Sequence, residues 1–244
     1  MRYFYDFHIH SCLSPCGSPD MTPSNIARMA ALAGCRIIAV SDHNSTGNCR
    51  PVAKAAEEAG IVAIPAMELT TSEEVHVLCL LPDLDAADAF GSYVRARLPD
   101  VKNRPEIFGD QTLMDEDDTV LGFEDRLLLN ACSISANEVP ALVRSFGGVA
   151  IPAHIDRNSF SLLSNLGFFD RAEGFPAAEI TRQCNPAVLA REHPELAGLP
   201  YIVNSDAHYL TDMPDAAYAI ELPGPTAAEV IRIIKEGRIW DIFY

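Results

Sequence analysis

The stretch FHIHSCLSPCG, residues 7–17, carries two histidines one residue apart at the end of a predicted strand over residues 3–9. Side chains at alternate positions of a strand project from the same face. His8 and His10 therefore point in the same direction and can bind one object between them. The Ser-, Pro- and Gly-rich residues that follow are typical of a loop. What the two histidines bind depends on where the other histidines of the chain lie.

Predicted strands and helices alternate along the whole chain. Further strands are predicted at residues 36–40, 61–64, 75–81, 148–152, 171–175, 200–204 and 217–222. Helices are predicted at residues 23–33, 51–59, 83–97, 135–146, 159–166 and 226–236. Such alternation indicates a parallel sheet with helices on both faces. About seven units of this kind favour an α/β fold with a closed or distorted (β/α)7 barrel, in one domain over residues 1–244.

Residues 98–124 interrupt this regular order. Within them, QTLMDEDDTVLG has the pattern of a hairpin around an acidic turn. We expect this region to be an insertion in the barrel, or a lid near its mouth, rather than a separate domain.

The composition predicts a soluble globular protein, with 48% apolar residues and a mean hydropathy of +0.07. No apolar run approaches the roughly 20 residues that a transmembrane helix needs. The first residues lack the apolar segment of a signal peptide. The seven cysteines are spread thinly, which is a poor disulfide framework and suits a reducing compartment. We therefore expect a cytoplasmic protein with no membrane contact.

The net charge of −16 restricts the kinds of partner. Binding of long nucleic acid relies on Lys and Arg side chains that neutralise phosphates, and the sequence shows no basic patch. Long nucleic acid is therefore an improbable partner. A small anionic substrate is still compatible with this charge if bound metal ions supply positive charge locally.

Six of the seven histidines and two carboxylates lie at or beside the ends of predicted strands. They are His8 and His10 in FHIH, His43 in VSDH, Glu68 after IPAM, His76 at the start of HVLCLL, His154 in IPAH, and Asp206 and His208 in NSDAH. In a (β/α) barrel the carboxyl ends of the strands meet at the active-site face. His193, which precedes a proline in a polar stretch, falls outside this pattern and is expected at the surface.

Each of these features alone has a structural explanation. A single histidine is often a hydrogen-bonded core residue, and the SDH and SDAH segments are also typical of turns and helix N-termini. The joint pattern favours metal binding, because imidazole and carboxylate groups are ligands for Zn²⁺, Mn²⁺ and Fe²⁺. Eight ligands are too many for one tetrahedral ion and suit two or three.

The ordered segments HIHS, SDHNS, the glutamate after PAM, the histidine that opens HVLCLL, PAHIDR and NSDAH resemble the motifs of the PHP family, named after polymerase and histidinol phosphatase. The resemblance extends from His8 to the final predicted helix. It implies a distorted (β/α)7 TIM-like barrel with two or three divalent metal ions, Zn, Mn or Fe, and a metal-dependent phosphoesterase activity.

The resemblance also implies a distribution of ligands. His8, His10, Glu68 and Asp206 would hold one metal, Glu68 would bridge to a second held by His76 and His154, and His43 and His208 would hold a third. In many family members a loop residue after HxH completes the third position. Two interpretations of Cys16 remain open here: a thiolate ligand that favours zinc or iron, or a loop cysteine with no ligand role. Asp20 is a further candidate for this position.

The expected reaction is attack of a metal-bound hydroxide on the phosphorus of a small phosphomonoester, a nucleotide or a short oligonucleotide. Glu68, Asp206 and His208 are the predicted catalytic residues, the last two as groups that assist proton transfer. Arg157 either binds a phosphate oxygen or pairs with a neighbour such as Asp156. The alternatives are an amidohydrolase-like metal hydrolase and a non-catalytic, metal-stabilised regulatory module.

Overall fold

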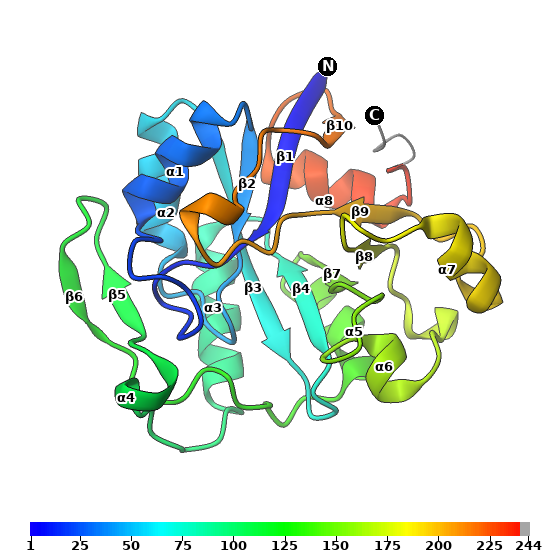
Figure 1. Cartoon of the computed structure of the whole chain (residues 1–244), viewed down its shortest axis with the longest axis horizontal. Coiled ribbons are helices and arrows are strands. Elements are labelled where there is room, and N and C mark those ends of the chain that lie inside the picture. Colours follow the sequence, from blue (N-terminus) through cyan, green and yellow to red (C-terminus); the bar gives the residue numbers. More distant parts are fainter. Residues whose placement is uncertain (240–244) are drawn as a thin grey trace.

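The computed structural model describes residues 1–239, and its main element is a six-stranded sheet (Figure 1). The strand order is β10-β1-β2-β3-β4-β7. These strands are β1 (Arg2–Ile9), β2 (Ile37–Val40), β3 (Val62–Thr70), β4 (His76–Leu80), β7 (Val149–Pro152) and β10 (Ala219–Glu221). Strands β1, β2 and β3 are parallel, whereas β4 is antiparallel to both β3 and β7, and β10 is antiparallel to β1. The expectation of a parallel sheet is therefore right for three strands and wrong for the others.

A second, parallel pair of strands lies along the open side of this sheet. It consists of β8 (Ala178–Ile180) and β9 (Tyr201–Val203). The pair is linked to the main sheet on both sides, because the Ile155 amide donates to the Glu179 carbonyl and the His10 amide donates to the Ala207 carbonyl. The result is a mixed α/β fold with a sheet curled into a half-barrel. A complete (β/α)7 barrel is not confirmed.

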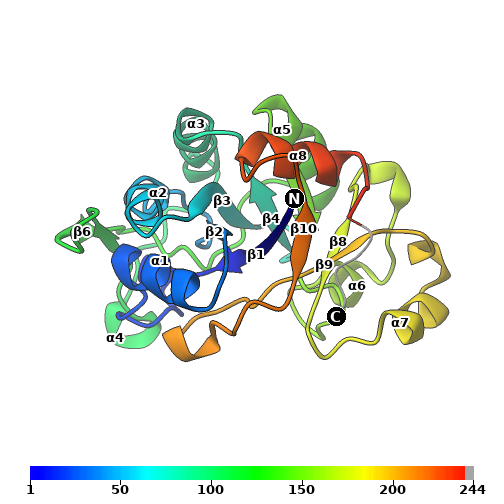
Figure 2. The same ribbon diagram turned by 90° about the horizontal axis from the view of Figure 1, so that it is seen from above.

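Helices cover the outer side of the curled sheet. The longer ones are α1 (Pro23–Leu32), α2 (Cys49–Glu58), α3 (Leu84–Arg95), α5 (Val139–Ser145) and α8 (Ala227–Lys235). Figure 2 shows these five around the central strands, with α8 and α5 at the top of that view and α1 and α2 on the left. Helix α1 begins where the sequence predicts, because the Thr22 side chain accepts a hydrogen bond from the Asn25 amide and Pro23 occupies the first turn. None of the helices in residues 1–239 has the length and apolar character that crossing a bilayer requires.

Side chains alternate between the two faces of β1, so that one face packs in the apolar core and the other faces the concave side of the sheet. Tyr5 and Phe7 stack with ring centroids 4.2 Å apart and pack in the apolar cluster beneath α8. His8 and His10 project from the other face of the same strand. All four side chains are buried. The two histidines therefore point into the concave side of the sheet, as the sequence pattern predicts.

The segment from residue 155 to residue 200 differs most from the prediction. The predicted strand at residues 171–175 is wrong, because Arg171–Glu173 form a 3-10 turn that ends at Gly174 with φ of 89°. Phe175 next to it is buried in the apolar core instead of pairing in a sheet. The actual strand, β8, follows a few residues later. Two short helices complete the segment: α6 (Leu162–Leu166), inside the predicted helix, and α7 (Pro186–Glu192), which was not predicted.

The region at residues 98–124 contains the expected hairpin, formed by β5 (Thr112–Met114) and β6 (Val120–Phe123), after the short helix α4 (Pro105–Phe108). The hairpin lies beside α1 and α2 (Figure 1). Its acidic turn reaches both helices: Thr22 donates to Asp118, and Lys54 pairs with Glu116. At its base the Thr112 amide donates to the Cys12 carbonyl, so the region also packs on the loop that follows β1.

Candidate metal centre

The strands bring the six strand-end histidines and both carboxylates to one place on the concave side of the sheet. His8 and His10 come from the end of β1, Glu68 from β3, and His43, His154, Asp206 and His208 follow β2, β7 and β9. His76 opens its strand, so it reaches this edge only because β4 runs in the opposite direction to β3. Isolated bridges between His43 and Glu68 and between Ile9 and Ala207 hold the strand ends together.

Glu68 lies at the middle of this cluster and is 1% exposed. Its Oε1 is 2.9 Å from His76 Nδ1, 3.2 Å from His154 Nε2 and 3.3 Å from His8 Nε2. Its Oε2 is 3.0 Å from His43 Nδ1 and 3.4 Å from His10 Nε2. Burial favours the neutral acid, but the surrounding His76, His8 and His43 outweigh it and hold the pKa of Glu68 well below its usual value. Glu68 is therefore an ionised carboxylate shared by five imidazoles.

The contacts within the cluster fit bound cations better than hydrogen bonds. His43 Nδ1, His76 Nδ1 and Glu68 Oε2 are buried and have no hydrogen-bond partner, although they face ring nitrogens or carboxylate oxygens at 3.0 Å or less. The Nε2 atoms of His8 and His10 face each other at 3.2 Å. A buried polar atom without a partner is costly. A positive ion between these lone pairs would satisfy several of them at once.

The donor atoms gather in three groups, within each of which they lie no more than 4.8 Å apart. The groups are His8, His10 and Glu68; His43, Glu68 and His76; and His10, Cys16, His43 and His208. Asp206 belongs beside the first group, because its Oδ1 is 3.1 Å from His10 Nε2 and 3.3 Å from His8 Nε2. His154 contacts Glu68 and therefore lies beside the second group. His43 thus lies between the second and third groups, whereas the resemblance assigned it to the third alone.

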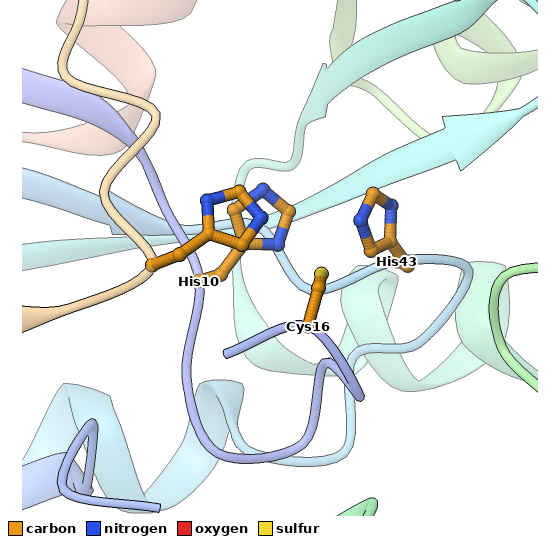
Figure 3. Close-up of side chains that lie close together, drawn as sticks. His10, Cys16 and His43 are labelled. Carbon is orange, nitrogen blue, oxygen red and sulfur yellow. The ribbon is translucent and has the colours of Figure 1, made fainter. Parts of the chain in front are cut away.

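Cys16 joins the third group from the loop after β1. Figure 3 shows its sulfur directed into the space between the rings of His10 and His43. Burial raises the pKa of the Cys16 thiol, but hydrogen bonds with His208 and His43 outweigh this and lower it to about 7. Asp20, the other candidate, is exposed and belongs to none of the three donor groups found among residues 1–239.

A set of buried residues behind the histidines orients their rings, and the sequence analysis missed its central member, Glu179. Both carboxylate oxygens of Glu179 are 3.0 Å from His8 Nδ1. The same carboxylate accepts hydrogen bonds from the His154 amide at 2.9 Å and the Asn204 side chain at 2.6 Å. Glu179 thus fixes His8 Nε2 toward the cluster, as outer partners of metal-binding histidines do. The only sequence signal was a single acid within the apolar segment FPAAEI.

Ser14 and Asp42 orient His10 in a similar way. Ser14 Oγ is 2.9 Å from His10 Nδ1 and donates to Asp42 Oδ1 at 2.7 Å. Asp42 also accepts from the amide and hydroxyl of Ser11 at 2.8 and 2.6 Å. This carboxylate therefore fixes the loop after β1 and, through Ser14, the ring of His10.

Three residues that immediately flank or form the cluster have left-handed backbone conformations. The φ angles are 49° at Asn44, 31° at His154 and 53° at Asp206. Such conformations are uncommon outside glycine and occur most readily for Asn, Asp and His. They turn the chain sharply after β2, β7 and β9, so that the side chains at those strand ends face the cluster.

Arg157 pairs with the cluster itself and not with its neighbour in sequence. Its Nη2 is 2.6 Å from Asp206 Oδ2, and the side chain is 45% exposed. Asp156 instead accepts hydrogen bonds from the amide and hydroxyl of Thr181. His193 lies away from the cluster beside Glu195, as expected for a residue outside the pattern.

A cavity of about 340 Å³ opens beside the cluster, which we call the inner cavity. Its lining includes His154, Arg157, Glu179, Arg182, Asn204 and Asp206. Among the described residues that line it, Arg157 and Arg182 are the only cationic side chains other than histidine. The carboxylates of Glu179, Asp206 and Asp212 also line the cavity, so it suits a small anion only with the positive charge of metal ions bound at the cluster.

Comparison with known proteins supports the PHP resemblance. The family model described as PHP-associated matches residues 189–239. A search of curated proteins finds no match. Among solved structures, the chain is similar to the lesion-specific endonuclease Q from Pyrococcus furiosus, with a TM-score of 0.70 and 19% identity over 97% of this chain. The alignment covers 56% of endonuclease Q, so this chain spans little more than half of that protein.

Two further structures share the fold. One is a two-domain protein from Bacteroides vulgatus that contains a predicted PHP-like metal-dependent phosphoesterase, with a TM-score of 0.57 and 15% identity over 98% of this chain and 64% of that one. The other is an amidohydrolase from Chromobacterium violaceum with bound sulfate, with a TM-score of 0.57 and 21% identity over 96% of both chains. The family model and the shared fold together support a PHP-domain family for this chain.

Proposed function

We propose, from its place among PHP-domain proteins, that this chain is a metal-dependent hydrolase of phosphate esters. The observation that carries the proposal is Glu68, an ionised and buried carboxylate with five imidazoles around it and several unpartnered donor atoms. A structural ion-pair network has no need for buried ring nitrogens that lack a hydrogen-bond partner, as His43 Nδ1 and His76 Nδ1 do. Several of the similar structures are described as phosphoesterases or endonucleases, which agrees with hydrolysis.

The three donor groups suggest where two or three divalent ions would bind. Glu68 would be shared by the first two groups, together with His8, His10 and Asp206 on one side and His43, His76 and His154 on the other. His10, Cys16, His43 and His208 would hold a third ion. Such ions lower the pKa of bound water and neutralise a phosphate. A thiolate at Cys16 would favour zinc or iron over manganese at the third position.

The chain's own residues would orient the substrate and handle its charge. Arg157 is the proposed phosphate ligand, because it is half-exposed and already holds a carboxylate oxygen at the edge of the inner cavity. Arg182 lines the same cavity and is a second cation for a non-bridging oxygen. His208 is 24% exposed at the side chain and its Nδ1 donates a hydrogen bond to the Asp206 carbonyl at 2.9 Å, so its Nε2 would either hold the third ion or, in protein with only two ions, transfer a proton at the mouth.

The similarity to endonuclease Q favours a second candidate substrate, an oligonucleotide or DNA. A solved complex of that enzyme contains a 27-mer duplex with an abasic lesion at the active site, and this chain matches it with a TM-score of 0.71. The net charge of −16 acts against long nucleic acid. We favour a small phosphate ester for this chain and keep DNA as the alternative that an assay must include.

The test combines metal content with phosphate release. Protein purified without chelator is expected to contain two to three equivalents of divalent metal by elemental analysis, and Cys16→Ala about one fewer. Cys184→Ala, at a half-buried cysteine outside the three donor groups of residues 1–239, is the matched control. The loaded enzyme should release phosphate from simple phosphomonoesters and leave amide substrates intact. Protein that binds no metal even after reconstitution would sink the proposal, and amide cleavage without phosphate release would favour the amidohydrolase alternative.

A further inference from the structure

A second cavity, of about 460 Å³, lies outside the inner cavity between α6 and α7. We call it the outer cavity. Its lining includes Asn158, Leu163, Gln183, Asn185, Val188 and Leu189. Its volume is within the range of about 300–1,000 Å³ typical of small-molecule sites. None of these six residues belongs to the metal cluster, so the proposed reaction does not explain this space.

The two cavities adjoin each other at Arg157. Arg157, Thr181 and Gln183 line both of them. A ligand whose phosphate lies beside Asp206 in the inner cavity can therefore extend past the Arg157 side chain into the outer one. In a phosphate ester the phosphate is attached directly to the alcohol part. An ester with its phosphate in the inner cavity would therefore place its alcohol part in the outer cavity.

The walls of the outer cavity combine neutral hydrogen-bonding groups with apolar surface. The side-chain amides of Asn158 and Gln183 make no hydrogen bond within the part of the chain that the structure describes, so both can donate to and accept from a ligand. Leu163, Val188 and Leu189 provide the apolar part. Such walls suit a ring system with polar edges.

The charges around the outer cavity argue against an anionic alcohol. Arg157 is the only lysine or arginine among the described residues that line it, and it is shared with the inner cavity and paired with Asp206. His193 also lines the outer cavity and lies beside Glu195. Asp156 and Glu192 also line the outer cavity. A leaving group with its own carboxylate or phosphate would meet two acidic side chains there, and like charges at short range are unfavourable.

We propose that the outer cavity binds the alcohol part of the phosphate ester, and that this part is an uncharged ring compound of about nucleoside size with hydrogen-bonding edges. The proposal rests on the proposed function, and it selects the nucleoside monophosphate class among small phosphate esters. Leu163 and Val188 would cover the faces of the ring, and the amides of Asn158 and Gln183 would bind its edges. Residues 158–189 would then determine specificity without taking part in the hydrolysis.

The experiment compares adenosine 5′-monophosphate with glycerol 3-phosphate, whose alcohol is too small to fill the outer cavity. We expect kcat/KM to be at least about tenfold higher for the nucleotide, the gain typical of a hydrophobic contact. Val188→Trp, which fills the cavity from α7, should remove that preference by lowering kcat/KM for the nucleotide to about the value for glycerol 3-phosphate. Val120→Trp is the matched control, since Val120 is similarly exposed and lies on β6 at the opposite end of the molecule (Figure 1).

Calorimetric binding of adenosine, which has no phosphate to release, to the manganese-loaded protein supplies a readout that does not need turnover. Val188→Trp should weaken that binding about tenfold and Val120→Trp should not. Equal kcat/KM for the two esters, or a nucleotide preference and affinity that Val188→Trp leaves intact, would overturn the outer-cavity proposal alone. Binding that Val188→Trp weakens, with no phosphate released from either ester, would support the cavity and contradict the proposed hydrolase.

Discussion

The edge of the main sheet and the segment from residue 155 to residue 200 are built in different ways. At the sheet edge, His8 and Glu68 are carried by strands of eight and nine residues, and His10 directly follows the first of these strands. All three side chains are at most 1% exposed. In the other segment β8 has three residues, α6 has five and α7 has seven, and most side chains that line the outer cavity are exposed or half-buried. The first region is part of a hydrogen-bonded sheet, whereas the second consists of short strands and helices joined by loops.

The two proposals assign chemistry to the first region and substrate recognition to the second. Metal ligands must be held in a fixed geometry, which a hydrogen-bonded sheet provides. Surface segments of short elements tolerate sequence change, and binding residues are often found on them. Glu179 is the exception: it belongs to the second region by sequence, yet it is buried and holds His8. The following predictions test whether the two regions divide the work in this way.

The largest effect is expected for Glu68→Gln at the sheet edge. The amide removes the negative charge shared by five imidazoles, so metal content should fall and kcat/KM should drop by more than about 100-fold, beyond the range seen for residues that only support ligands. The far-ultraviolet circular dichroism spectrum should be unchanged. Glu57→Gln on the exposed face of α2 is the control, with wild-type values expected. Normal turnover and metal content in Glu68→Gln would exclude a bridging role for Glu68.

Glu179→Gln tests whether Glu179, although it lies in the second region, supports the metal cluster through His8. Loss of this carboxylate leaves His8 Nδ1 with a weaker partner, so metal affinity or kcat/KM should fall about 10- to 100-fold while the ligands themselves remain. Glu221→Gln on the exposed face of β10 serves as the matched variant and should behave as wild type. If Glu179→Gln and Glu221→Gln have the same affinity for metal, Glu179 is a structural residue of the second region only.

The cysteines of the two regions should react differently with iodoacetamide in metal-free protein. The pKa of Cys16 is lowered to about 7, whereas burial and Asp156 raise the pKa of Cys184 to about 11. Because the thiolate is the reactive form, labelling of Cys16 should increase as pH rises through about 7, and Cys184 should stay almost unlabelled there. A thiol of lower pKa is also a weaker nucleophile, so we expect Cys16 to be labelled on the order of 50-fold faster than Cys184 near pH 7. Peptide mass spectrometry measures both rates, and added Zn²⁺ should protect Cys16.

The smallest effect is expected for Arg50→Ala, outside both regions. Arg50 pairs with Asp88 on the surface between α2 and α3, and both side chains are 58% exposed. An exposed pair of this kind contributes little to stability. Metal content, nucleotide preference and kcat/KM should match those of the wild type. A clear loss of activity in this variant would show that phosphate binding extends further from the inner cavity than the two regions suggest.

The sheet edge could be predicted from the sequence because most strands there are largely apolar and end at or shortly before a ligand residue, whereas β4 begins with one. The orientation of β4 was missed, although Thr71–Val75 is too short a connection for a parallel crossover and indicates a hairpin. The segment that carries Glu179 was harder to predict, because AEI is too short for its alternation to identify a strand and contains no run of β-branched residues. Its place is set by contacts with residues far along the chain, among them His8 and Asn204.

The left-handed residues Asn44, His154 and Asp206 have an evolutionary consequence. A non-glycine residue held in this conformation costs on the order of 1–3 kcal/mol. The chain therefore carries this cost at three strand ends. At Asn44 the side chain offsets it by donating to the Leu128 and Asn130 carbonyls and accepting from the Thr70 amide, whereas His154 and Asp206 direct their side chains to the cluster. A lineage that no longer needed the cluster would gain stability by replacing His154 or Asp206 with glycine. Decay of the site in this fold would therefore be favoured by selection for stability and would not depend on drift alone.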